Sequence, residues 1–147
     1  MKSIKRLIFA AAALLSLAAF SSCTKSNDSE TFADVLKGEW NITRWYGYNS
    51  KGETIDFDAD AMAGDTFKYS AGKLTETING SATKYTVNIP DLVKEVTYSE
   101  DVIAGVLTDD EGYVIYAGIT FKDKNHIVIT QTNETNTWGY NYDCTRK

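Results

Sequence analysis

Few side chains in this sequence are spaced for catalysis. His126 is the only histidine, and no cysteine or second histidine accompanies it as a co-ligand, so neither a transition-metal site nor a serine-type triad is expected. Glu76 shares a predicted strand face with Leu74 and Ile78, but a glycosidase of the usual kind needs two such acids. The sequence therefore predicts a protein that is not an enzyme, with no catalytic residue, no metal and no cofactor.

One acidic stretch has the opening pattern of a calcium-binding loop. Asp56, Asp58 and Asp60 alternate as ligands do at the start of an EF-hand loop. That loop also needs a glycine and a glutamate, but Ala61 and Phe67 occupy those positions. We interpret the stretch as a solvated acidic loop in which Asp58 caps a single helical turn.

The chemistry that the sequence does offer is binding by aromatic side chains. Alternation along predicted strands places several rings on inner faces, where each offers an apolar body with a polar tip. Such rings can surround a small amphipathic ligand, or they can simply fill the core, and the filled core is the favoured alternative. The ring-bearing candidates are Tyr46, Tyr48, Tyr85, Tyr113, Trp138 and Tyr140.

Arg44 is a further candidate ligand-binding residue. In a regular strand it shares the face of Trp40 and Ile42, where its guanidinium could pair with a ligand carboxylate. A bulge after Ile42 would instead turn Arg44 outward and Trp45 inward, and we favour this second arrangement.

The elements that must position these residues are mostly short strands. Phe32, Val35 and Leu36 have the spacing of one helical turn or two, and Gly38 can end that helix. From Trp40 onward the apolar period is two, and Asn79-Gly80 is typical of a tight hairpin. Strands are predicted at 40–48, 55–57, 66–70, 73–78, 83–89, 93–98, 102–108, 113–121, 126–131 and 137–146. This pattern indicates an all-β antiparallel barrel or sandwich with a short N-terminal helix.

The first residues predict export. Three cationic residues precede an apolar run, 7–20, that is too short to span a bilayer. The following Phe20-Ser21-Ser22-Cys23 resembles a bacterial lipobox, in which the cysteine is acylated and becomes the first residue. We therefore expect a signal peptide at 1–22, a flexible polar tether at 23–30 and a barrel domain at 31–147, anchored to the membrane by lipid on Cys23.

Charge and cysteine content fit this organisation. The formal net charge is −5 and would be −8 without the three cations of segment 1–22, which disfavours nucleic acid as a partner. With Cys23 acylated, Cys144 has no disulfide partner and is expected to be a small buried residue. The expected location is the bacterial cell envelope, with the outer membrane favoured and the periplasmic or surface face left open.

The run Leu36-Lys37-Gly38-Glu39-Trp40, together with Arg146 near the end of the last strand, resembles the lipocalin-like families of the calycin group. The chain resembles small bacterial lipoproteins of lipocalin-like type more closely than it resembles the classical lipocalins. The resemblance implies an up-and-down barrel of about eight strands, in which Trp40 fills the closed end and Arg146 packs over its ring. Gly38, Trp40 and Arg146 are then the structural signature of the fold.

Closure of such a barrel requires the first and last strands to pair. If Arg146 lies opposite Trp40, an unbroken antiparallel register follows. It predicts the pairs Cys144–Ile42, Tyr142–Arg44, Tyr140–Tyr46 and Trp138–Tyr48.

Two functions remain open from the sequence. The leading one is a membrane-tethered binding module for a small apolar or amphipathic ligand. The alternative is a structural or protein-interaction barrel with a filled core, which would act through an outer surface formed by Trp45, Val114 and Tyr116.

Overall fold

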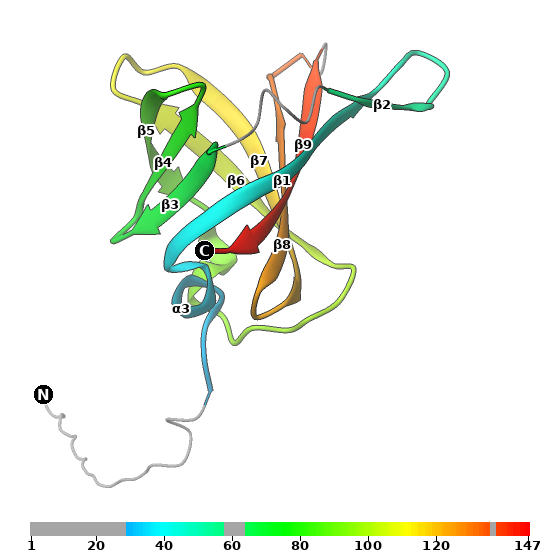
Figure 1. Ribbon diagram of the computed structural model, residues 1–147. Coiled ribbons are helices and arrows are strands. Elements are labelled where there is room, and N and C mark those ends of the chain that lie inside the picture. Colours follow the sequence, from blue (N-terminus) through cyan, green and yellow to red (C-terminus); the bar gives the residue numbers. More distant parts are fainter. Residues whose placement is uncertain (1–28, 58–63, 136–137) are drawn as a thin grey trace, which may run out of the picture. The chain divides into compact units, whose positions relative to one another are not determined.

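The computed structural model describes residues 29–57, 64–135 and 138–147. Within the compact unit Phe32–Lys147, eight antiparallel strands close into a barrel, and a ninth short strand extends one of them (Figure 1). The predicted all-β barrel with one short N-terminal helix is therefore confirmed. The predicted signal peptide, Cys23, most of the predicted tether and most of the helical turn predicted at 58–64 lie outside the described residues.

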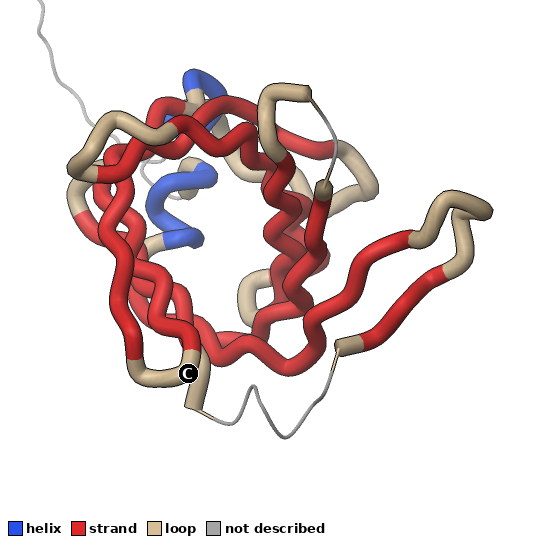
Figure 2. The backbone as a smooth tube through the Cα atoms, turned by 90° about the horizontal axis from the view of Figure 1, so that it is seen from above, coloured by secondary structure: helices blue, strands red, loops and turns tan. Residues whose placement is uncertain are grey.

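The strands follow one another around the barrel in chain order. The exception is β2, which pairs only with the second half of β1 and forms an arm with it that leaves the ring of strands (Figure 2). The elements are α3 (Phe32–Leu36), β1 (Gly38–Tyr48), β2 (Thr54–Asp56), β3 (Thr66–Ser70), β4 (Lys73–Ile78), β5 (Ser81–Asn88), η3 (Pro90–Val93), β6 (Val102–Asp109), β7 (Val114–Asp123), β8 (His126–Thr132) and β9 (Gly139–Arg146).

The core lies where the inner faces of the strands meet. In β7 the alternation is complete: Ile115, Ala117, Ile119 and Phe121 are buried, as the apolar period predicts. Every residue of the described core belongs to Phe32–Lys147, so this unit contains the complete described core.

The barrel closes through β1 and β9, and the predicted register is correct for its first part. Trp40 lies opposite Arg146, and Ile42 lies opposite Cys144. The register then shifts, because Thr43 is an extra residue in β1 at a β-bulge.

The bulge makes the predicted pairs beyond Ile42 wrong. Arg44 lies opposite Asp143, Trp45 opposite Tyr142 and Tyr46 opposite Asn141. Because side chains alternate along a strand, one extra residue moves each later side chain to the other face. Trp45 consequently points into the barrel and Arg44 out of it, which was the favoured alternative.

Helix α3 lies across one end of the barrel (Figures 1 and 2). Phe32, Val35 and Leu36 are buried, and the Phe32 ring lies 4.9 Å from that of Phe121. A helix of this length is unstable alone, so this packing must hold it in place. Gly38 (φ +116°) turns the chain into β1 in a conformation that glycine adopts without strain.

Trp40 and Arg146 fix this closed end. The Trp40 ring is fully buried, and its Nε1 donates to Leu36 O at 2.8 Å. The Arg146 guanidinium carbon lies 4.2 Å from the centre of that ring. The same guanidinium donates to the carbonyls of Val35 and Lys37, so a cation binds the C-terminal end of the helix. The packing of Arg146 over Trp40 is thus confirmed.

The strand predicted at 93–98 is wrong. Pro90 begins a 3-10 helix, η3, whose only buried side chain is Leu92. Val93 is 79% exposed, and the chain continues without a regular strand until β6. Among the described residues, no helix has both the length and the apolar character needed to span a bilayer.

Candidate functional site

The end of the barrel opposite α3 carries a set of packed aromatic rings. The Trp45 ring centre lies 4.6 Å from Phe57, 5.5 Å from Tyr140 and 5.9 Å from Tyr142. Trp138 stacks on Tyr140 at 5.3 Å. We call these five residues the rim cluster. It runs from the barrel interior, where Tyr142 is buried, to the mouth, where Trp138 and Tyr140 are partly exposed.

Trp45 has a polar atom without a partner. Its Nε1 is buried, and it makes no hydrogen bond to any described residue. An unpaired buried N–H costs on the order of 1–3 kcal/mol, so buried indoles usually have an acceptor. The rim cluster therefore encloses an N–H donor that lacks an acceptor among the described residues.

Two hollows adjoin the rim cluster, one between the β1–β2 arm and β9 and the other over β8 and β9 beside Tyr48. The first has a volume of about 240 Å³ and is lined by Gly47, Ile55 and Phe57. The second has a volume of about 360 Å³ and is lined by the polar residues Thr130, Gln131, Thr132 and Asn141. Four residues line both hollows: Tyr48, Trp138, Gly139 and Tyr140. We call them the first and the second rim hollow.

Glycines shape the seam between the hollows. A Cβ atom at Gly47 would lie 3.1 Å from the Gly139 carbonyl oxygen and 3.7 Å from the Phe57 ring. Glycine at this position lets β1 and β9 approach closely while leaving space beside the rings.

The interior of the barrel contains two acidic side chains, Glu76 and Asp65, but not Arg44. Gln131 is buried, and its Nε2 donates to Glu76 Oε1 at 2.8 Å. Burial raises the pKa of Glu76, and the hydrogen bond from Gln131 opposes this shift. Burial, with the nearby Glu76 charge, raises the pKa of Tyr85 to about 12. Asp65 is also buried and accepts the backbone N–H of Asn79.

Arg44 is not part of this interior. It is exposed, and its Nε and Nη2 donate to both carboxylate oxygens of Asp56. These hydrogen bonds lower the pKa of Asp56. The guanidinium also lies 4.3 Å from the centre of the Tyr46 ring. Arg44 therefore has partners on the outer face, as the favoured bulge predicts, and its candidate role as an inward ligand-binding residue is wrong.

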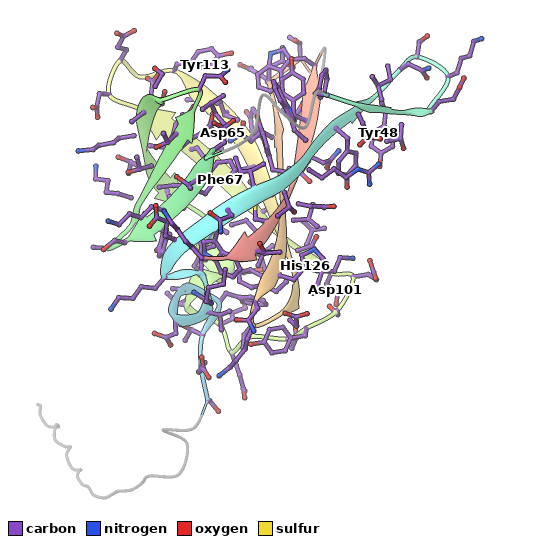
Figure 3. The ribbon with its side chains drawn as sticks, in the orientation of Figure 1. Tyr48, Asp65, Phe67, Asp101, Tyr113 and His126 are labelled. Carbon is purple, nitrogen blue, oxygen red and sulfur yellow. The ribbon has the colours of Figure 1, made fainter. Side chains whose placement is uncertain are left out.

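The tyrosine candidates divide between the two faces. Tyr85 is buried inside the barrel as predicted, whereas Tyr46 is turned to the outer face by the bulge. Tyr48 is 61% exposed but lines both rim hollows. Tyr113 precedes β7 and is 53% exposed, so its predicted inner position is wrong; Figure 3 places it at the end opposite α3, away from the β1–β2 arm that carries Tyr48.

The structure also places five other residues that the sequence singles out. Trp45 does not join Val114 and Tyr116 on the outer face, although those two are exposed there. Cys144 is buried as predicted, and burial raises the pKa of its thiol. His126 begins β8 at the edge of the barrel nearer α3 (Figure 3). The described residues contain no group of three or more His, Cys, Asp or Glu side chains that could hold a metal ion.

Sequence reasoning missed part of this site. The favoured bulge places Trp45 inside the barrel, but the sequence does not indicate Phe57, Gln131, Gly47 or Gly139 as site residues. Gln131 lies on the same strand face as Ile127 and Ile129, so period-two spacing was a signal that could have identified it. The partners of Phe57 depend on the bulge, which leaves no mark in the residue types.

Glu76 gives a prediction about pH. Because its pKa is raised in the folded state, its contribution to stability is fully present below the unfolded value of 4.5 and is lost as pH rises through the folded value. Glu76→Gln keeps an acceptor for Gln131 and removes the charge. We expect the variant to be more stable than wild type at neutral pH, with the gap closing as pH falls toward 4.5. Urea unfolding across this pH range measures the difference in free energy of unfolding between the two proteins. A difference that grows toward acid pH would contradict a raised pKa for Glu76.

No protein-family model matches the chain, and no curated protein sequence matches it. Two solved structures are similar in fold. A redesigned β-barrel, b11L5F_LGL, is 14% identical over 80% of this chain and 96% of its own, with a TM-score of 0.43. A second redesigned β-barrel, mFAP1, bound to DFHBI, is 16% identical over 80% of this chain and 100% of its own, with a TM-score of 0.38.

Proposed function

We propose that the protein is a lipid-anchored, extracytoplasmic binding module of lipocalin-like type. Its barrel holds a small apolar or amphipathic molecule at the rim cluster, opposite α3. Anchoring is supported by the lipobox-like Phe20-Ser21-Ser22-Cys23 after an apolar run. The lipocalin-like assignment is supported by the contact of Arg146 with Trp40 over the closed end.

The observation that carries ligand binding is the unpaired Nε1 of Trp45. It lies inside a group of rings that adjoins two hollows. A ligand acceptor at this N–H would remove a cost of about 1–3 kcal/mol, while its apolar part would contact aromatic surface. The polar residues that line the second rim hollow are hydroxyls and amides, with no Lys or Arg to pair with a carboxylate, so the site disfavours a fatty acid.

Binding can be tested with the neutral dye Nile red, whose emission rises in apolar surroundings. The chain Thr24–Lys147 suits this test because it contains the complete described core. We expect saturable binding that Trp138→Ala weakens by about tenfold, the loss of one good contact. Tyr113→Ala is the matched control, since Tyr113 is exposed but lines neither rim hollow. No saturable binding, or equal losses in both variants, would refute a rim site.

The anchor is tested separately in the full chain. Cys23→Ser should move the protein from the detergent phase to the aqueous phase on phase partitioning, because the acylated residue is gone. Detergent partitioning that is the same with and without Cys23 would refute lipidation there.

A further inference from the structure

The two rim hollows are lined without charge. None of the described residues that line them is Asp, Glu, Lys or Arg, although the protein has a net charge of −5. The nearby Arg44 is already paired with Asp56. An anionic or cationic ligand group would lose hydration here without gaining a counter-charge. The lining therefore selects a neutral ligand.

Aromatic faces supply the apolar contact. Trp138 and Tyr140 are nearly parallel, with 27° between their planes, and Tyr48 is largely exposed beside them. Rings held in this way present broad surfaces that can contact the C–H face of a saturated ring. Trp138 is held at the start of β9, because its backbone oxygen accepts a hydrogen bond from Thr132 Oγ1 at 2.7 Å.

Amide and hydroxyl groups supply the polar contacts of the second rim hollow. Thr130 Oγ1 donates to Asn141 Oδ1 at 2.8 Å, which leaves the amide nitrogen of Asn141 as a donor at the hollow. Uncharged groups of this kind match ligand hydroxyls, which also donate and accept. A purely apolar ligand would offer no acceptor to the amide nitrogen of Asn141.

Together these features define the ligand chemistry. We infer that the rim hollows bind a neutral, polyhydroxylated ring, the chemistry of an uncharged saccharide; this inference rests on the proposed function. The two hollows share Tyr48, Trp138, Gly139 and Tyr140, so a ligand of more than one ring can cross the seam at Gly139 and occupy both.

The test is an array of neutral and acidic oligosaccharides probed with Thr24–Lys147, followed by calorimetry on those that bind. We expect binding to neutral members. Trp138→Ala should weaken it by at least about tenfold through loss of the stacking face. Asn141→Asp should also weaken it, because it keeps the side-chain shape and the acceptor for Thr130 but removes the N–H donors. Tyr113→Ala should bind as wild type.

Three results would overturn the inference: no saccharide binding, preference for acidic members, or affinity that neither rim substitution changes. The Nile red titration separates the proposed binding at the rim from the inferred saccharide chemistry of the ligand. If Nile red binding depends on Trp138 while no saccharide binds, the rim site stands and only the saccharide chemistry falls. If neither ligand binds at the rim, the proposed function falls as well.

Discussion

Trp40→Ala is expected to lower the free energy of unfolding by about 4 kcal/mol, the usual cost of removing a buried tryptophan. The substitution leaves a cavity under α3, removes the hydrogen bond to Leu36 and takes away the surface on which Arg146 lies. Domains of this size are stable by about 5–15 kcal/mol, so the loss is a large part of the total. Urea unfolding at neutral pH measures it.

Trp40→Phe is the graded control. It keeps an aromatic ring but loses Nε1, so Leu36 O loses its donor, and we expect a cost of about 2 kcal/mol. The variant also keeps the barrel folded if Trp40→Ala does not fold at all. Two substitutions that each cost less than about 1 kcal/mol would show that Trp40 does not hold the closed end.

Trp45→Phe is expected to abolish most ligand binding at little cost in stability. It keeps a ring against Phe57 and Tyr142 but removes the buried N–H that has no partner. Loss of ring area destabilises the fold, while removal of an unsatisfied donor offsets that loss, so the net change should be within about 1 kcal/mol. Nile red affinity and urea unfolding are to be measured on the same preparations.

Trp45→Ala separates packing from hydrogen bonding at this position. Without any ring, the cluster loses its centre, and the free energy of unfolding should fall by about 3 kcal/mol. If Trp45→Phe instead binds Nile red as tightly as wild type, the unpaired N–H is not part of a ligand site.

The closed end of the barrel could be predicted because the resemblance to lipocalin-like families implies that Trp40 fills it and that Arg146 packs over the Trp40 ring. Gly38 and Trp40 stand two residues apart at the change from helical to alternating period, and Arg146 ends the last alternating run. The pairing of these two strands then fixes the register as far as Ile42, and the structure confirms it.

The open end could be predicted only in part, because one extra residue decides it. Thr43 is β-branched and typical of a regular strand, so nothing in its type marks a bulge. Without the bulge, Arg44 would enter the barrel, and the binding chemistry would be that of an anion receptor. With it, Trp45 enters the barrel and joins the rim cluster, and the chemistry that we propose there is that of an aromatic site.

Contacts between side chains far apart in the sequence also could not be predicted. Glu76 was correctly placed on an inner face, but the Gln131 amide that binds it lies 55 residues further along the chain. Tyr113 fits the period of β7, yet it follows the turn at Gly112 and precedes the first paired residue of the strand. Periodicity specifies a face only where the strand is already paired.

The central claim is that this barrel carries a small molecule at its open end. Its most direct test is native mass spectrometry of Thr24–Lys147 purified from the cells that make it, compared with the denatured mass and with Trp45→Phe prepared in the same way. A bound small molecule that is lost on denaturation and depleted in Trp45→Phe is the predicted result. Native and denatured masses that agree for both proteins, with no Nile red binding to either, would contradict the claim.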